Sequence, residues 1–385
     1  MTADDYICHM QKVGILGGGQ LGRMLLQAAA NYPVETFVLE NDAECPSAHL
    51  CDHFTKGDIR SFDAVYQFGK GLDAITIEIE NVNTEALEKL ESEGVKVFPK
   101  PSVLKTIRNK ILQKKYYADN SIPSPAYIVT DNLAALQQQS DFLPAVHKIG
   151  EGGYDGKGVQ VLRKPEDITK GFDAPSVLEK MVDIDKEIAQ MVAVSSTGEI
   201  ALYPPVEMLF DHSLNLLDFQ LCPATINEKT LWKVEAIAVQ VVKNFKSPGI
   251  FAIELFVDRS GAVLVNETAP RVHNSGHHTI EAHFSSQFDM LWRIILGFPL
   301  GNTDAILPSV MVNVIGAEGY SGKVKYEGLE EVLGIDNAFV HLYGKKATKP
   351  GRKMGHVTVL SKEKQELIHQ ANKIKSLLSV QSTSD

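Results

Sequence analysis

Cysteine is scarce in this chain, and long apolar runs and an excess of positive charge are absent; each of these features excludes a class of protein. The 385 residues include 4 cysteines without a C-x-x-C pair, which is too few for a disulfide scaffold and is typical of a reducing cytoplasm. No run reaches the roughly 18 apolar residues that a membrane-spanning helix needs. The formal net charge of -10 argues against a general binder of nucleic acids or membrane surfaces. Any anionic ligand must therefore be held by local lysines and arginines.

The length and the order of apolar segments predict several domains. A chain of 385 residues exceeds one hydrophobic core and should form two or three domains. Residues 1–11 carry acids instead of a basic leader, so we expect a loose tail. Residues 12–105 alternate strands and helices, including a helix with Thr84 as its N-cap, which predicts a mainly parallel sheet covered by helices. A helix over 102–119 should lead into the next domain, and an amphipathic helix over 362–378 should close the chain.

Two glutamates on a predicted β-hairpin are the strongest chemical signal. Residues 250–257 and 262–266 are rich in Ile, Phe, Val and Leu, and turn residues separate them, as a hairpin requires. If Ser260-Gly261 forms a two-residue loop, counting back along both strands pairs Glu254 with Glu267. Opposed carboxylates need a compensating cation, and such oxygen ligands suit Mg²⁺, whose shell substrate phosphates often complete. Alternatively the two glutamates are unrelated, because a one-residue bulge would place them on opposite faces.

A glycine-rich turn near the start of the chain has three open interpretations. The segment Gly17-Gly18-Gly19-Gln20-Leu21-Gly22 matches G-x-G-x-x-G directly after an apolar strand, and Glu40 ends the next strand. Such a turn lets a phosphate or ribose approach backbone N–H groups at the positive end of a helix. The pattern is typical of NAD-binding proteins, but another phosphorylated ligand or a purely structural tight turn fits it as well.

A second glycine-rich segment, 152–158, lies between two short predicted strands and includes Tyr154 and Asp155. It lacks the Walker spacing, but its backbone donors can cover phosphates and close after binding. We therefore expect the mobile tip of a hairpin in a lid subdomain over about 122–182. Lys148, at the end of the preceding strand, offers a charge for a nucleotide phosphate, although an exposed surface lysine is the alternative.

Histidines crowd the segment that follows the glutamate hairpin. If this segment were helical, His273, His277 and Glu281 would share one face and form a transition-metal site. Gly276 disfavours that helix. A loop that aims Arg271 and His273 at an anion explains the same residues.

A basic turn lies near the C-terminal end of an otherwise acidic chain. It contains Lys345, Lys346, Arg352, Lys353 and His356. Such a turn suits a single phosphate monoester, and a solvated surface turn is the alternative.

In this order, these segments resemble the ATP-grasp superfamily and, within it, the N5-carboxyaminoimidazole ribonucleotide synthetases of purine biosynthesis. The resemblance rests on GGGQLGRM at 17–24, GGYDGKG at 152–158, Glu179 with Glu187, NETAPRVHNSGHHT at 266–279 and PGRKMGH at 350–356. It implies a mixed α/β and α+β architecture. We expect a Rossmann-like domain over 12–105, an ATP-grasp domain with a mobile lid over 106–299, and a small β-rich domain over 300–385.

The resemblance also implies a role for each site residue. Lys148 would bind the ATP phosphates, Glu179 the adenine amine and Glu187 the ribose hydroxyls, and Lys110 and Asn266 would also contact the nucleotide. Glu254 and Glu267 would hold Mg²⁺. The residues placed around 5-aminoimidazole ribonucleotide are Gln20, Tyr154, Asp155, Asn274, Lys345 and Arg352. Arg271, His273 and Asp155 would take part in catalysis, and the glycine turn would then cradle a substrate and not NAD.

The implied reaction starts with bicarbonate attacking the γ-phosphate of ATP to give carboxyphosphate. Carboxyphosphate would release CO2 in a closed site, where the 5-amino group of the ribonucleotide captures it. The resemblance further implies a homodimer. The rival interpretations are another ATP-grasp ligase, such as a formate-activating transformylase, and an NAD-dependent dehydrogenase or NAD sensor built on the first glycine turn alone.

Overall fold

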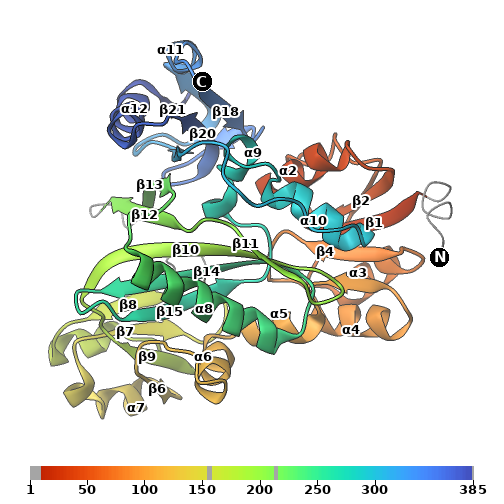
Figure 1. The fold of residues 1–385 in the computed structure, drawn as a ribbon. Helices are drawn as coiled ribbons and strands as arrows, with labels where there is room; N and C mark the ends of the chain where they lie inside the picture. The colour runs from red at the N-terminus through yellow and green to blue at the C-terminus, as the bar shows by residue number, and fades with distance from the viewer. Residues whose placement is uncertain (1–9, 154–157, 212–215, 384–385) are drawn as a thin grey trace.

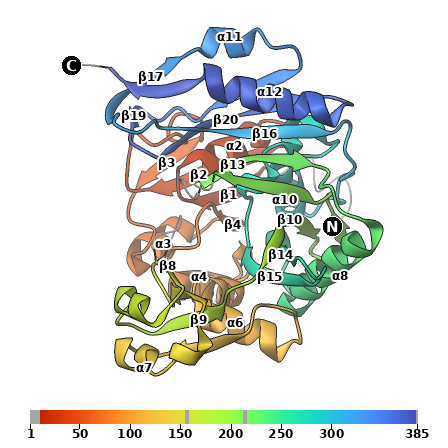
Figure 2. The ribbon, with the colours of Figure 1, turned by 90° about the vertical axis from the view of Figure 1, so that its left-hand side faces the viewer.

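A computed structural model describes residues 10–153, 158–211 and 216–383 of the chain (Figure 1). Across these residues the strands form four sheets, of five, nine, three and four strands. Figure 2 shows the C-terminal helix and its strands at one end of the molecule and the four-stranded sheet at the opposite end. No helix among the described residues has both the length and the apolar character needed to cross a bilayer.

The five-stranded sheet at the N-terminus is parallel, with the order β3-β2-β1-β4-β5. Its strands are β1 (Gln11–Leu16), β2 (Val34–Glu40), β3 (His53–Lys56), β4 (Ala74–Ile77) and β5 (Lys96–Phe98), and its helices are α2 (Gln20–Ala29), α3 (Phe62–Gly69) and α4 (Thr84–Ser92). The prediction of a helix-covered parallel sheet is confirmed. Since parallel strands share one carboxyl edge, the loops after β1, β2 and β4 lie together.

Two helix ends differ from the sequence predictions, and asparagine explains both. Asn83, not Thr84, is the N-cap of α4, because its side chain accepts a hydrogen bond from Ala86 N at 2.8 Å. The single helix predicted over 102–119 is wrong: the chain forms α5 (Pro101–Ile107) and α6 (Lys110–Asp119). Asn109 caps α6 by accepting from the N–H groups of Ile111 and Leu112, a stronger start signal than the apolar pattern that continues through it.

The antiparallel four-stranded sheet follows, with the order β6-β9-β7-β8. Its strands are β6 (Tyr127–Thr130), β7 (Ala145–Ile149), β8 (Val159–Leu162) and β9 (Ser176–Lys180); α7 (Leu133–Gln137) and the short helices η1 (Ser140–Phe142) and η2 (Pro165–Lys170) connect them. The glycine-rich segment joins β7 to β8, as the hairpin prediction requires. This sheet therefore presents Lys148 and Glu179 from neighbouring strands.

A nine-stranded sheet forms the centre of the molecule and continues into the C-terminal part. Its strands are β10 (Ile184–Val194), β11 (Ile200–Leu202), β12 (Val206–Asp211), β13 (Leu216–Cys222), β14 (Gly249–Asp258), β15 (Val263–Ala269), β16 (Ser309–Ile315), β18 (Ala338–Leu342) and β20 (Lys353–Leu360). Helix α8 (Glu228–Phe245) packs on it through Val234, Ala238 and Val241, an apolar stripe with the spacing of a helix face. The β13–β16 ladder crosses the position near residue 300 where the sequence predicts a domain boundary.

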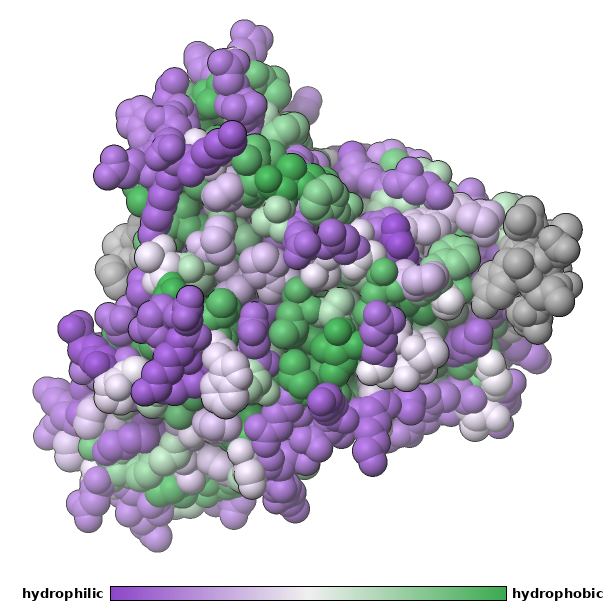
Figure 3. All heavy atoms as spheres, in the orientation of Figure 1, coloured by the Kyte–Doolittle hydropathy of each residue, from purple (hydrophilic) through white to green (hydrophobic). Residues whose placement is uncertain are grey.

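The C-terminal part adds α11 (Leu329–Leu333), α12 (Lys364–Leu377) and a small sheet of β17 (Gly322–Glu327), β19 (Ala347–Thr348) and β21 (Ser379–Ser382). Helix α10 (Gln287–Leu296) packs against α2 of the N-terminal part, and the indole of Trp292 donates to Leu25 O at 2.7 Å. Hydrophilic residues cover most of the face in Figure 3, and apolar residues gather toward its middle.

Candidate active site

The hairpin of β14 and β15 places Glu254 directly opposite Glu267. The loop is one residue longer than predicted, because Asp258 N donates to Ala262 O at 2.9 Å and Gly261 has a φ of +79°. From the loop as far as Leu255, the strand pairing is therefore one residue away from the predicted register. A bulge at Asn266 then restores the predicted register at Glu254. The predicted pairing is therefore right because two one-residue offsets cancel, and both carboxylates lie on one face of the sheet.

The two carboxylates of this pair have different electrostatic surroundings. The ammonium group of Lys110, from the first turn of α6, contacts Glu267 and holds the pKa of that carboxyl well below its usual range. Burial, together with the charge of Glu267, raises the pKa of Glu254. His273 Nε2 lies 3.8 Å from Glu254 Oε1, and burial lowers the pKa of this imidazole to about 3. The pair thus behaves as opposed carboxylates must: one is ionised beside a cation, and the second resists ionisation until more positive charge arrives.

A second group of charges connects the four-stranded sheet to this hairpin. Glu179 is buried and lies 3.2 Å from the ammonium groups of both Lys114 and Lys148. Lys148 also donates to Asn266 Oδ1 at 3.0 Å. On β10, burial raises the pKa of Glu187 to about 7. The predicted nucleotide residues Lys148, Glu179 and Asn266 are therefore joined directly, next to the opposed carboxylates.

Lys114 is the residue of this group that the sequence analysis missed. It is buried, and burial lowers its pKa to about 8. The sequence spacing could have identified it, because Lys114 follows Lys110 by one turn of α6 and residues four apart share a helix face. One helix face thus brings two ammonium groups toward two different glutamates.

The glycine turn after β1 is occupied by carboxylates of the chain itself. Gly19 N and Gly22 N both donate to Glu78 at 2.6 Å, and Gly18 N donates to Glu40 at 3.0 Å. A Cβ atom on Gly19 would lie 2.5 Å from Glu78 Oε1. The glycines therefore permit the close approach of a side chain, and the donors that a dinucleotide would use already bind Glu78 and Glu40.

Replacing Gly19 by alanine should lower the free energy of unfolding by about 1–3 kcal/mol, as overpacking a filled site does. Gly19 has a φ of -77°, so the penalty comes from Glu78 and not from backbone strain. Urea unfolding measures it, and Gly334→Ala is the matched control, since Gly334 has a φ of -80° and its Cβ would meet nothing closer than 3.5 Å. Equal stabilities of the two variants would show that Glu78 moves aside without cost.

The loop after β15 carries the predicted catalytic residues and joins them to the N-terminal part. Arg271 Nε lies 3.0 Å from Glu80 Oε1, two residues beyond Glu78. His273 N donates to Gln287 Oε1 at 2.8 Å, which fixes the loop to α10. The Oδ1 atom of Asn274 is buried and accepts no hydrogen bond from the described residues, so it remains available to a ligand.

The helical face of His273, His277 and Glu281 that a transition-metal site would require does not form, as the presence of Gly276 led us to expect. The segment contains only the short helices η3 (Asn274–Gly276) and α9 (Thr279–Ala282). Glu281 instead lies 2.5 Å from His341 Nε2 on β18, and the Nδ1 atom of His273 lies 2.9 Å from Ser275 Oγ. The glycine in the segment interrupts the helix, as its low helix propensity predicts.

The remaining predicted residues lie on segments around this group. Lys345 donates to Lys353 O at 2.7 Å and Arg352 to Ala347 O at 2.6 Å, so both close the basic turn. Lys346 lies 2.7 Å from Glu44 of the N-terminal part. Gln20 is the first residue of α2. Tyr154 and Asp155 lie outside the described residues.

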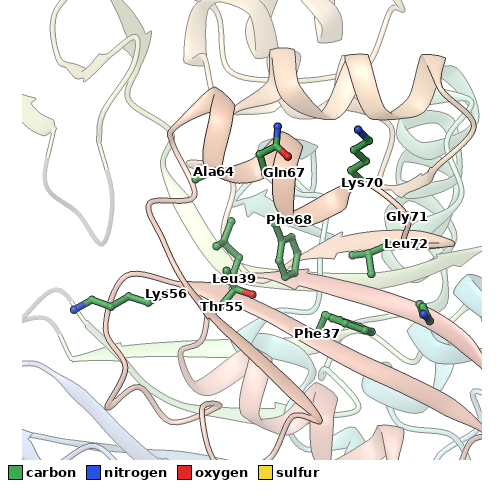
Figure 4. A pocket seen from close by; sticks show the side chains of 11 residues that line it. Phe37, Leu39, Thr55, Lys56, Ala64, Gln67, Phe68, Lys70, Gly71 and Leu72 are labelled. Carbon is green, nitrogen blue, oxygen red and sulfur yellow. The ribbon is translucent and has the colours of Figure 1, made fainter.

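A separate pocket of about 460 Å³ lies in the N-terminal part, between α3 and the sheet (Figure 4). Its lining includes Phe37, Leu39 and Phe68, with Lys56 and Lys70 among its polar residues. It contains none of the carboxylates described above, so the candidate active site is a different part of the molecule.

Comparisons with known proteins identify the domains of this chain and its relatives. The family model for the ribonucleotide synthetase preATP-grasp domain matches residues 10–108, that for the ATP-grasp domain matches 115–288, and that for the phosphoribosylaminoimidazole carboxylase C-terminal domain matches 309–370. A phosphoribosylaminoimidazole carboxylase of Vigna aconitifolia is 36% identical over 90% of this chain, which spans 64% of that relative. The chain likewise spans 66% of the relative of that name in Ogataea methanolica.

Shorter relatives match along nearly their whole length. The N5-carboxyaminoimidazole ribonucleotide synthase of Brucella melitensis is 35% identical, with 90% of this chain and 95% of the relative covered. The crystal structure of the synthetase from Thermotoga maritima has a TM-score of 0.90 at 38% identity, covering 97% of this chain and 100% of that one. A structure from Aspergillus clavatus, in complex with ADP and 5-aminoimidazole ribonucleotide, has a TM-score of 0.87 at 32% identity, covering 96% and 98%. The chain therefore belongs to the N5-carboxyaminoimidazole ribonucleotide synthetases, a family of the ATP-grasp superfamily.

Proposed function

We propose that this protein is an ATP-dependent ligase that carboxylates the 5-amino group of 5-aminoimidazole ribonucleotide, with bicarbonate as the carbon source and ADP and phosphate as the other products. The observation that carries the proposal is the opposed pair Glu254 and Glu267, with Lys110 against Glu267 and Lys148 against Asn266. Such a group is suited to a nucleoside triphosphate with its metal ion. Family membership is the reason for naming 5-aminoimidazole ribonucleotide as the acceptor.

The nucleotide would lie between the four-stranded sheet and the β14–β15 hairpin. Lys148 and Lys110 would contact the phosphates, Glu179 the adenine amine, Glu187 the ribose hydroxyls and Asn266 the phosphate side. Related proteins support ATP as the ligand, since the Aspergillus clavatus enzyme has been solved as a complex with ATP. Lys148 and Lys110 are now held by Glu179, Asn266 and Glu267, so they have only to exchange partners when phosphates arrive.

The carboxylates fit Mg²⁺, because they are directly paired across the hairpin and because burial and the charge of Glu267 raise the pKa of Glu254, so a bound cation would stabilise its ionised form. Glu254 and Glu267 would hold the ion. When bound, it would neutralise the charge that develops on the transferred phosphoryl group. Lys110 would then be released from Glu267 to contact phosphate oxygens.

The acceptor side would use the loop after β15. Arg271, held by Glu80, would orient the bicarbonate or carboxyphosphate anion. Burial lowers the pKa of His273, which keeps its imidazole neutral at pH 7 but makes it a weak base in the free protein. His273 and Asp155 are therefore alternative acceptors of the amine proton. Gln20, Tyr154, Asn274, Lys345 and Arg352 would surround the ribonucleotide. Exclusion of water is essential, since leaked CO2 or hydrolysed carboxyphosphate wastes ATP.

The test of the proposal is phosphate release with ATP, Mg²⁺, bicarbonate and 5-aminoimidazole ribonucleotide, with each component omitted in turn. We expect stoichiometric phosphate and carboxylated product only in the complete mixture. Turnover that needs no ribonucleotide, or that a different nucleotide acceptor supports better, would overturn the proposed substrate. The domain division, the cytoplasmic location and the homodimer remain predictions, and sedimentation measures the last of these.

Arg352→Ala should raise the KM for the ribonucleotide with little change in the KM for ATP, and Lys345→Ala should act in the same direction more weakly. Loss of a charge-assisted contact between arginine and phosphate costs about 1.5–3 kcal/mol, or roughly a 10- to 150-fold change. Lys349→Ala, an exposed lysine of the same turn, is the control and should leave both constants unchanged. A parallel rise of both constants in Arg352→Ala would show that the turn supports the fold.

A further inference from the structure

Three metal-ligating side chains that the proposed reaction does not use converge in the interior. They are Cys222, at the end of β13, and His278 and His283, which flank α9. All are buried, with exposed fractions of 3%, 1% and 3%. The thiol and one ring nitrogen from each histidine all lie within 4.8 Å of one another.

The hydrogen bonds of His283 make its Nε2 atom the acceptor that faces the thiol of Cys222. Its Nδ1 atom lies 2.9 Å from Thr303 O. A carbonyl oxygen only accepts, so Nδ1 carries the proton and Nε2 carries the lone pair. Nε2 lies 3.7 Å from Cys222 Sγ. A backbone carbonyl on the far ring nitrogen is the usual way in which proteins orient a metal-binding histidine.

His278 provides the second, independent indication. Its Nε2 atom is buried and has no hydrogen-bond partner among the described residues. Its Nδ1 atom lies 3.1 Å from Gln220 Nε2 and also hydrogen-bonds to the backbone of Ser275. Gln220 Nε2 is an amide donor, so in the free protein Nδ1 accepts this hydrogen bond and the ring proton lies on Nε2. Metal binding at Nε2 therefore requires the proton to move to Nδ1, where Ser275 O accepts it. A buried nitrogen without a partner is unfavourable and calls for one.

The spacing fits one small ion. With Zn–S of about 2.3 Å and Zn–N of about 2.0–2.1 Å at a tetrahedral angle, the sulfur and nitrogen ligands lie about 3.6 Å apart. The distance between Cys222 Sγ and His283 Nε2 is 3.7 Å. The ligand atom of His278 lies within 4.8 Å of the other two, so it would have to move closer to complete the third corner. Imidazole and thiolate ligands select zinc over the hard cation that the carboxylate pair suits.

We propose that Cys222, His278 and His283 bind a Zn²⁺ ion that stabilises the fold, with a water molecule as the fourth ligand of the tetrahedron. On binding, the Cys222 thiol gives its proton to solvent and the thiolate bonds to the ion, while both imidazoles bind as neutral donors. The site would tie β13 to both ends of α9, and so fix the loop that carries Arg271 and His273 onto the central sheet. It rests on residues that the proposed carboxylation does not employ, so either proposal can fail alone.

The experiment measures metal content and ligand identity in the full-length protein. After expression in zinc-supplemented medium and dialysis, we expect about one zinc ion per chain bound by its three protein ligands. Cys222→Ala and His283→Gln should lose this ion. Cys45→Ala is the matched control, because Cys45 is also a buried free thiol but belongs to the N-terminal part. Replacement of zinc by Co²⁺ should give the thiolate-to-metal charge-transfer band in wild type and Cys45→Ala, but not in Cys222→Ala.

Three outcomes would overturn the site. One is wild-type protein that contains no zinc and gives no cobalt band after refolding with Co²⁺, a measurement that needs no variant to fold. Another is zinc retained by Cys222→Ala. The third is zinc lost on Glu267→Gln, which would assign the ion to the carboxylate pair. As a further readout, a chelator should lower the thermal midpoint of wild type and leave that of Cys222→Ala unchanged.

Discussion

Glu267→Gln should lower kcat by about a hundredfold to a thousandfold, the usual effect of removing one preorganised electrostatic group. The loss follows from the geometry, because Glu267 faces Glu254 and is the ionised member of the pair. Glu254→Gln should act similarly on kcat. Its effect on the thermal midpoint should differ from that of Glu267→Gln, because burial opposes the ionisation of the Glu254 carboxyl that the substitution removes. Steady-state kinetics over a range of Mg²⁺ concentrations and the thermal midpoint of the free protein measure the two effects.

The matched control is Glu88→Gln, because Glu88 also pairs with a lysine, Lys105, at 2.7 Å, but on the exposed surface of α4. Surface pairs of this kind contribute about 0–1 kcal/mol, so this variant should retain full activity. A Glu267→Gln variant with normal kcat and normal Mg²⁺ dependence would refute the assignment of the metal to this hairpin.

With bicarbonate labelled in both carbon and oxygen, the carbon label should appear as an acid-labile carbamate on the ribonucleotide. Labelled oxygen should enter the released phosphate. Both results follow from attack of bicarbonate oxygen on the γ-phosphate, which leaves that oxygen on phosphorus when carboxyphosphate breaks down. Mass spectrometry of phosphate and of the nucleotide product measures the two labels. We expect each label in its product when labelled bicarbonate is used, and neither label when unlabelled bicarbonate is used.

Formate is the informative competitor, because it is also a small planar anion that a γ-phosphate can activate. We expect formate to support neither phosphate release nor product formation. Labelled formate recovered as a formyl group on a glycinamide nucleotide would overturn the bicarbonate assignment. It would leave the ATP-grasp fold and the metal hairpin in place, which is why this test separates the substrate from the scaffold.

Local patterns were enough to predict the main features of the fold. The N-terminal sheet followed from apolar strands alternating with helices, and α12 begins and ends within two residues of the helix predicted over 362–378. Strand β3 was not predicted, because His53–Lys56 is a largely exposed edge strand without an apolar pattern. Helix α5 ends where Asn109 caps the next helix, a local signal that the apolar pattern concealed.

The candidate site was less accessible to sequence reasoning where contacts join distant residues. Glu254 and Glu267 could be paired by counting, since they share one hairpin. Glu78 binds the N–H groups of Gly19 and Gly22 from 59 and 56 residues away, and no spacing rule relates them. This contact favours the structural interpretation of the glycine turn over the NAD interpretation.

The β13–β16 ladder means that the family models and the folding units of this chain have different limits. The ATP-grasp match ends at residue 288 and the C-terminal match begins at 309, yet Phe219 faces Val312 and Leu221 faces Val310 across one sheet. A chain cut between the two matches would leave β13 as an open edge, with Phe219 and Leu221 deprived of their apolar neighbours. Open apolar edges recruit further strands from other molecules. The segment that sequence comparison recognises as a complete module is thus an incomplete sheet, and it should aggregate when produced alone.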